Sequence, residues 1–178
     1  MMNRKINEAI NDQIKNEIES SYIYLSMVAY FHSLSLDGMA HWMRCQAHEE
    51  MIHAMKLFDH INDRGGKITL LDVKQLRTEW PSPLEAFRSA YAHEQFISGK
   101  INDLVALSRE EKEYASEPLL AWFVDEQVEE EANASKIVAD LELAGDDKSA
   151  LLMLDRELGT RAFPPGSPFD PAALKSED

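Results

Sequence analysis

Six polar residues with a shared spacing are the strongest candidates for chemistry in this sequence. They form two sets of three, and each member of the first set has a counterpart 77 positions later: Glu17, Glu50 and His53 in the first set, and Glu94, Gln127 and Glu130 in the second. The interval within each set also agrees, since 50 − 17 = 33 and 127 − 94 = 33. The chain therefore contains a pseudo-repeat, and twofold pairing of its halves would bring all six residues to one level of the core.

These residue types favour a pair of divalent metal ions. The four glutamates carry a total charge of −4 when ionised, which two divalent cations would neutralise. Carboxylates combined with an imidazole and no thiolate suit iron or manganese, and zinc can also occupy such a site. In the second set the neutral amide of Gln127 replaces a glutamate. The second metal should therefore bind less tightly, which suits a site that releases its product.

The candidate residues interrupt apolar stripes that have the three- and four-residue spacing of a buried helix face. Three stripes run from Ile10 to Phe31, from Met43 to Ile61 and from Leu120 to Leu141. The predicted stripe of the remaining segment is Leu84, Phe87, Tyr91, Glu94, Ser98, Ile101 and Val105. An isolated ionised carboxylate costs several kcal/mol at such a position, so these glutamates need cations, protons or hydrogen-bonding partners.

Glycine and proline are clustered, which leaves room for four long helices and a short fifth one. The predicted helices run from about Arg4 to Ser33, from the N-cap Asp37 to near Arg64, from the N-cap Ser82 onward, from about Ser116 to Gly145, and from about Asp147 to Leu158. Residues 1–159 are predicted to form one domain. Residues 160–178 contain four of the seven prolines and are predicted to be an irregular tail.

The lengths of the connections predict the topology of an all-α bundle. About four residues join the first two helices and about five join the third and fourth, so each pair should be an antiparallel hairpin. Residues 65–81 can span roughly 56 Å when extended, whereas a helix of 27 residues is roughly 40 Å long. This segment can return along the whole bundle, which would make the second and third helices parallel.

The composition excludes several classes of partner. The 178-residue chain has 18 Lys and Arg against 32 Asp and Glu, for a net charge of −14, so nucleic acid is not expected as a partner. No apolar stretch approaches the roughly 20 residues that span a bilayer, so no membrane association is expected. Cys45 has no second cysteine with which to form an internal disulfide, and no signal peptide is evident. A cytoplasmic location is therefore predicted.

The motifs around the candidate residues resemble those of the non-haem ferritins of bacteria and archaea. The similarity covers about residues 3–158 and lies in Glu17, Tyr24, Glu49-Glu50-Met51-x-His53, His93-Glu94-Gln95 and Glu126-Gln127-x-Glu129-Glu130-Glu131. The resemblance implies a ferritin-like four-helix bundle with a short fifth helix. It also implies a homo-oligomeric shell of 24 subunits with octahedral symmetry, which oxidises Fe(II) with O2 or H2O2 and stores the ferric mineral.

The resemblance also implies roles for individual residues. The first iron would take Glu17, Glu50 and His53, and the second Glu94 and Glu130, with Glu50 bridging the two ions and Gln127 beside them. A third iron site would use Glu49, Glu126, Glu129 and Glu130. Tyr24 is expected to act at the centre as a hydrogen-bond donor or an electron donor. Glu113 and Glu117 are candidates for a threefold ion channel.

Some features favour other interpretations. Met51 stands at the position of the haem-ligating methionine of bacterioferritins, but those proteins repeat Glu-x-x-His in the fourth helix, so no haem is expected here. The remaining histidines lack a repeated carboxylate spacing and are predicted to lie at the surface or an interface: His32, His41, His48, His60 and His93. A di-iron oxidase of an organic substrate or peroxide and a noncatalytic iron-buffering shell remain as alternative functions.

Overall fold

The structure is a computed structural model that describes residues 2–74, 77–163 and 167. Its helices are α1 (Arg4–Ser33), α2 (Asp37–Asp63), α3 (Pro83–Glu110), the 3-10 turn η1 (Tyr114–Ser116), α4 (Glu117–Ala144) and α5 (Lys148–Leu158). These bounds confirm the predicted helices to within a few residues. Residues 164–166 and 168–178, most of the predicted irregular tail, lie outside the described residues.

The helix ends follow the local sequence signals, with one exception. The Ser82 hydroxyl accepts a hydrogen bond from the Glu85 amide at 3.2 Å, as expected of an N-cap. Gly145 ends α4 with a positive φ of 51°, a conformation that glycine adopts without strain. The prediction of Asp37 as N-cap was wrong. Asp37 is the first residue of α2, and its carboxylate lies 2.8 Å from Nδ1 of His32 at the end of α1.

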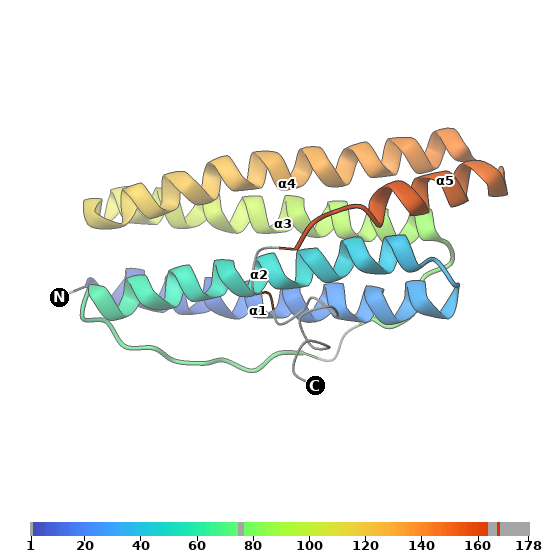
Figure 1. The fold of residues 1–178 in the computed structure, drawn as a ribbon. Helices are drawn as coiled ribbons and strands as arrows, with labels where there is room; N and C mark the ends of the chain where they lie inside the picture. The colour runs from blue at the N-terminus through green and yellow to red at the C-terminus, as the bar shows by residue number, and fades with distance from the viewer. Residues whose placement is uncertain (1, 75–76, 164–166, 168–178) are drawn as a thin grey trace.

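The four long helices form two antiparallel hairpins joined by a long crossover, and α2 runs parallel to α3 (Figure 1). The crossover passes along α1, where two asparagines hold its backbone. Asn7 donates to the Lys67 carbonyl at 3.0 Å, and Asn11 accepts from the Thr69 amide at 2.7 Å. The predicted topology is therefore confirmed. None of the helices among the described residues is both long and apolar enough to cross a membrane.

Three of the four predicted stripes are buried as expected, and the stripe on α3 is corrected. The buried residues of α3 are Ala86, Phe87, Ala90, Glu94, Ile97, Ile101, Leu104 and Ser108. The helix is therefore rotated so that Ala90 and Ile97, rather than Tyr91 and Ser98, face the interior. Tyr91 and Ser98 are half-buried, at the edge of the interface.

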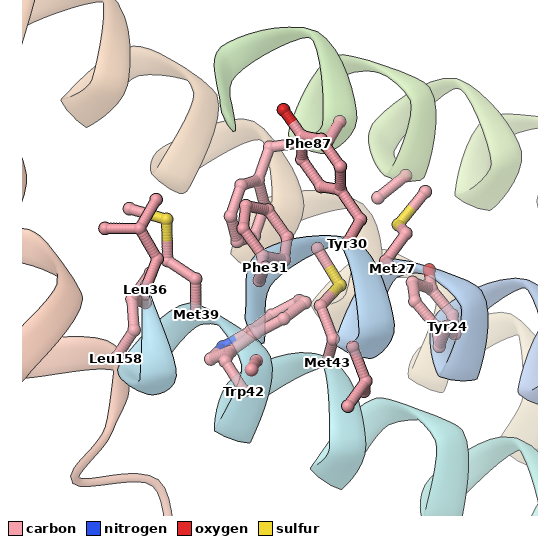
Figure 2. Close-up of a cluster of buried hydrophobic side chains, with 14 of the residues drawn as sticks. Tyr24, Met27, Tyr30, Phe31, Leu36, Met39, Trp42, Met43, Phe87 and Leu158 are labelled. Carbon is pink, nitrogen blue, oxygen red and sulfur yellow. The ribbon is translucent and has the colours of Figure 1, made fainter. Parts of the chain in front are cut away.

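Two hydrophobic clusters fill the ends of the bundle and leave a polar layer between them. One cluster contains Ile10, Ile14, Leu57, Ile101 and Phe123 among its residues. The other is drawn in Figure 2, where aromatic and methionine side chains of α1 and α2 meet Phe87 of α3 and Leu158 of α5. Because both clusters are tightly packed and apolar, they fix the height at which the candidate residues of the four helices meet.

Helix α5 packs against the start of α2 within the same chain. The Met39 amide donates to Oδ1 of Asp155 at 2.8 Å, and Leu158 is buried beside Leu36 and Met39 (Figure 2). The approach is close enough that a Cβ atom on Gly38 would lie 1.7 Å from the Asp155 carbonyl oxygen. Gly38 is therefore required by the contact between these two helices.

Candidate metal centre

The six candidate residues form a buried polar layer at the middle of the bundle. α1 contributes Glu17, α2 contributes Glu50 and His53, α3 contributes Glu94, and α4 contributes Gln127 and Glu130. Each retains 5% or less of its surface exposure. The pseudo-repeat in the sequence therefore corresponds to a common level in the fold, because equivalent positions on the two hairpins face each other across the core.

The first predicted set of ligands converges in space. Ligand atoms of Glu17, Glu50 and His53 all lie within 4.8 Å of one another. Within the set, Nδ1 of His53 is 3.3 Å from Oε2 of Glu50, because the two residues are one helical turn apart on α2. This group has the composition and spacing of a metal site.

A second group shares the imidazole but differs from the predicted second set. His53, Glu126 and Glu130 also offer ligand atoms within 4.8 Å of one another. Nε2 of His53 lies 3.8 Å from Oε1 of Glu126, a residue that was expected at a third iron. The imidazolium attracts the Glu126 carboxylate, which explains why Glu126 turns toward the centre.

Glu94 is held by hydrogen bonds from two sides. The Tyr24 hydroxyl donates to Oε1 of Glu94, and the Gln127 amide lies 3.3 Å from Oε2. Tyr24 is fully buried, and burial followed by the Glu94 charge holds its pKa well above the usual range. The phenol is therefore neutral and serves as a hydrogen-bond donor to a predicted ligand.

Two glutamines that the sequence analysis did not identify contact the centre. Gln13 donates to Oε1 of Glu17 at 2.8 Å, and Gln46 donates to Oε2 of Glu130 at 2.7 Å. A signal for them exists, since 46 − 13 = 33 is the same interval that separates Glu17 from Glu50. Each amide fixes one oxygen of a carboxylate and leaves the other available. Oε2 of Glu17 is buried and has no hydrogen-bond partner among the residues that the structure describes.

Burial is the largest factor that raises the pKa values of the carboxylates in this layer. It raises the pKa of Glu94 to about 7, with the Tyr24 and Gln127 hydrogen bonds acting in the opposite direction. Burial and then the Glu94 charge raise the pKa of Glu130 to about 8. Burial disfavours the imidazolium of His53, but Glu126 and Glu50 overcome it and raise the pKa to about 11. The carboxylates are therefore short of positive charge, which metal ions would supply.

The chemistry of these side chains fits iron. Four carboxylates and one imidazole are hard to intermediate ligands that suit Fe(II) and Fe(III), and no thiolate competes for a softer metal. Glu17 has one oxygen without a hydrogen-bond partner among the described residues, and its carboxylate offers a ligand atom within 4.8 Å of those of Glu50 and His53. In the metal-free layer, protons on Glu94 and Glu130 reduce the negative charge, and bound cations would replace these protons.

The remaining residues expected at a third iron lie in different environments. Glu126 belongs to the second group, whereas Glu129 is exposed and belongs to neither group. Oε2 of Glu49 lies 2.6 Å from a guanidinium nitrogen of Arg161, a contact that the sequence analysis did not predict. The role of Glu49, Glu126 and Glu129 in binding iron remains a prediction.

Some of the other predicted positions need correction. His48 is buried rather than at the surface, and His93 is half-buried with Nε2 2.7 Å from the Ser20 hydroxyl.

Glu113 is 9% exposed and pairs with Arg64 at 2.6 Å, so one of its oxygens is already engaged. Glu117 lies 3.8 Å from Arg109 near the surface. The channel role of Glu113 and Glu117 remains a prediction.

The raised pKa values of the carboxylates predict that the metal-free protein becomes less stable between pH 5 and pH 8. Glu94 and Glu130 lose their protons near pH 4.3 when unfolded but at about 7 and 8 when folded. The folded state then binds more protons, so the free energy of unfolding falls as the pH rises, by up to about 1.4 kcal/mol per pH unit for each proton. Thermal unfolding after chelation checks this. The Glu94→Gln, Glu130→Gln double variant should show a shallower slope, and equal slopes would contradict the prediction.

Comparison with known sequences matches most of the chain to one family. The family profile of the ferritin-like domain matches residues 7–144. A bacterial non-heme ferritin of Bacteroides fragilis (strain 638R) is 42% identical over 163 residues, covering 90% of this chain and 100% of the relative. A bacterial non-heme ferritin of Staphylococcus aureus (strain MRSA252) is 37% identical, covering 92% and 98% of the two chains.

Solved structures of ferritins have a fold similar to that of this chain. An engineered closed form of the Archaeoglobus fulgidus ferritin superposes with a TM-score of 0.91 at 48% identity, covering 92% of this chain and 100% of that one. A structure of the open pore ferritin of the same archaeon gives a TM-score of 0.90 at 48% identity, covering 91% and 99%. The fold and the positions of its helices are therefore shared with these proteins.

Proposed function

From the premise that the chain belongs to the ferritin family of iron-storage proteins, we propose that it is a ferroxidase that builds an iron-storing cage. It oxidises Fe(II) with O2 or H2O2 at a di-iron centre within each subunit. The observation that carries the proposal is the buried convergence of Glu17, Glu50 and His53 within 4.8 Å. Twenty-four subunits with octahedral symmetry enclose the ferric mineral.

The two irons are substrates held by side chains of all four long helices. Glu17, Glu50 and His53 hold the first, and Glu94 and Glu130 hold the second, with Glu50 between them. Each Fe(II) gives up one electron, and the two electrons reduce O2 with two protons to H2O2, or H2O2 with two protons to water. Gln127 contributes an uncharged amide beside the second iron, which weakens its hold on the ferric product.

Protons leave the centre when the irons bind. His53 must lose a proton to coordinate a metal, although its carboxylate neighbours raise its pKa to about 11 in the metal-free chain. Two Fe(II) ions replace that proton and those of the carboxylates, and their charge of +4 balances four glutamates. Tyr24 keeps its hydrogen bond to Glu94 and orients the carboxylate throughout.

The positions of the cavities favour iron over an organic substrate. Three larger cavities, of about 500, 480 and 380 Å³, are lined by residues other than the predicted ligands. The cavity that reaches Gln127 measures about 110 Å³ and is lined by Ser98, Asn102 and Glu131 among others. Such a space accommodates small ions and water. A second function as an oxidase of organic molecules is therefore not proposed.

A third iron site on α2 and α4 completes the proposal. Glu49, Glu126, Glu129 and Glu130 would bind the product ion on its way to the interior of the cage. The relatives named above are bacterial non-heme ferritins and an open pore ferritin, and we propose that this chain assembles into a cage. A cytoplasmic location of the cage remains a prediction from the sequence.

The native mass and the oxidation kinetics together test the proposed function. Sedimentation should give a particle of 24 chains, each of 20.3 kDa. Anaerobic loading with two Fe(II) per chain, followed by mixing with O2 or H2O2, should produce ferric absorbance far faster than in buffer alone. A full shell that oxidises iron no faster than buffer would indicate a noncatalytic store. A small oligomer that oxidises iron rapidly would indicate a di-iron oxidase instead.

A further inference from the structure

The segment that follows α5 places Arg161 on the carboxylate of Glu49. After Gly159 the chain turns back toward α2 (Figure 1), and a guanidinium nitrogen of Arg161 lies 2.6 Å from Oε2 of Glu49. The side chains of Arg161 and Glu49 keep 22% and 27% of their exposure, so the pair is largely shielded from solvent. A charge-assisted hydrogen bond in such a position is stronger than one at an open surface.

A cation–π contact positions this guanidinium, and a hydrogen bond from His41 holds the backbone that carries it. Its central carbon lies 4.7 Å from the centre of the Trp42 ring, a cation–π distance. Nε2 of His41 is 2.6 Å from the Arg161 carbonyl oxygen, to which the ring N–H donates. The His41 ring also meets Phe163 edge to face, with the ring centres 4.9 Å apart. Arg161 is therefore a fixed cation rather than a loose surface side chain.

The charge of Glu49 interacts with the carboxylates of Glu126 and Glu130 at the metal centre. It precedes Glu50 on α2, and burial is the main factor that raises its pKa, with the Arg161 charge opposing and the Glu126 carboxylate adding to the shift. After burial and Glu94, the charge of Glu49 is the next factor that raises the pKa of Glu130. The guanidinium thus neutralises one member of a group of three carboxylates.

We propose that Arg161 is a tethered competitor for the third metal ion. The inference rests on the third site of the proposed function. A divalent cation and a guanidinium repel each other, so both cannot share the Glu49 oxygens at full strength. A metal ion that binds Glu49 must displace Arg161, whereas the ions held by Glu17, Glu50, His53 and Glu94 need not. The third site therefore fills after the first two and releases its ion readily.

Zinc binding to an Arg161→Gln variant tests the competition without redox chemistry. In the full-length cage, calorimetric titration with Zn²⁺ should show third-site binding at least about threefold tighter than in the parental protein, given the typical strength of a partly exposed ion pair. The first two ions should bind as before. Anomalous diffraction at the zinc edge locates each ion. Arg156→Gln is the matched control, because it removes the same charge from an exposed position on α5.

His41→Ala provides a second variant that keeps the cation but removes the hydrogen bond to its backbone. This variant should also bind the third Zn²⁺ more tightly than the parental protein does, but the gain in affinity should be smaller than in Arg161→Gln. Unchanged third-site affinity in both variants would overturn the role of Arg161 and leave the third site itself standing. If no third Zn²⁺ binds to any of the proteins at saturation, the third site is wrong and the competition falls with it.

Discussion

His53→Ala is expected to slow the oxidation of the first two Fe(II) per chain at least about tenfold, as loss of a metal-site residue typically does. His53 is the imidazole shared by both groups of converging side chains, with one nitrogen 3.3 Å from Glu50 and the other 3.8 Å from Glu126. Its removal would take a proposed ligand from the first iron. Stopped-flow absorbance after anaerobic loading measures the rate.

His32→Ala provides the control for this variant. His32 lies at the exposed end of α1 beside Asp37, far along the bundle from the centre, so its loss should leave the oxidation rate unchanged. Both variants should retain the helical spectrum of the parent. Parental oxidation kinetics in His53→Ala would show that the metal site has been assigned to the wrong residues.

Gly38→Ala is expected to lower the melting temperature by about 5 °C or more, because overpacking a close contact commonly costs about 2 kcal/mol. The added Cβ would lie 1.7 Å from the Asp155 carbonyl oxygen, and a backbone atom cannot turn away as a side chain can. α5 must move off α2, which breaks the bond from Met39 to Asp155 and uncovers Leu158 (Figure 2). Calorimetry, with native mass as a second readout, measures the effect.

Gly99→Ala separates this contact from the general effect of replacing a helical glycine. Gly99 is exposed on α3, and a Cβ there would meet nothing within 4 Å. Alanine should therefore stabilise that helix by about 0.5–1 kcal/mol. If Gly38→Ala melts at the parental temperature while Gly99→Ala melts higher, the close packing of α5 on α2 is not present in solution.

Most of the fold could be predicted because its signals are local and periodic. Helix ends carry caps such as Ser82 and Gly145, and the repeated interval of 33 residues aligns Glu17 with Glu50 across a hairpin. The error on α3 shows the limit of periodicity. Phe87, Glu94 and Ile101 are compatible with two alternating patterns, and only packing against the neighbouring helices selects Ala90 over Tyr91.

Several contacts that the sequence analysis missed join segments far apart in the chain. Arg161 and Glu49 are separated by 161 − 49 = 112 residues, and no repeat or motif links them. The same is true of Gly38 and Asp155, whose approach depends on the angle at which α5 leaves α4. Such pairs are set by the geometry of the assembled bundle, so local pattern alone does not identify them.

The division of the ligands between the two hairpins has a consequence for the order of synthesis. Glu17, Glu50 and His53 all belong to α1 and α2, so the ribosome completes this triad before it makes α3. Helical hairpins form quickly because their contacts are local, and N-terminal units fold first during translation. The nascent first hairpin would therefore already bring three proposed metal ligands together, and an ion captured there would favour docking of the second hairpin around it.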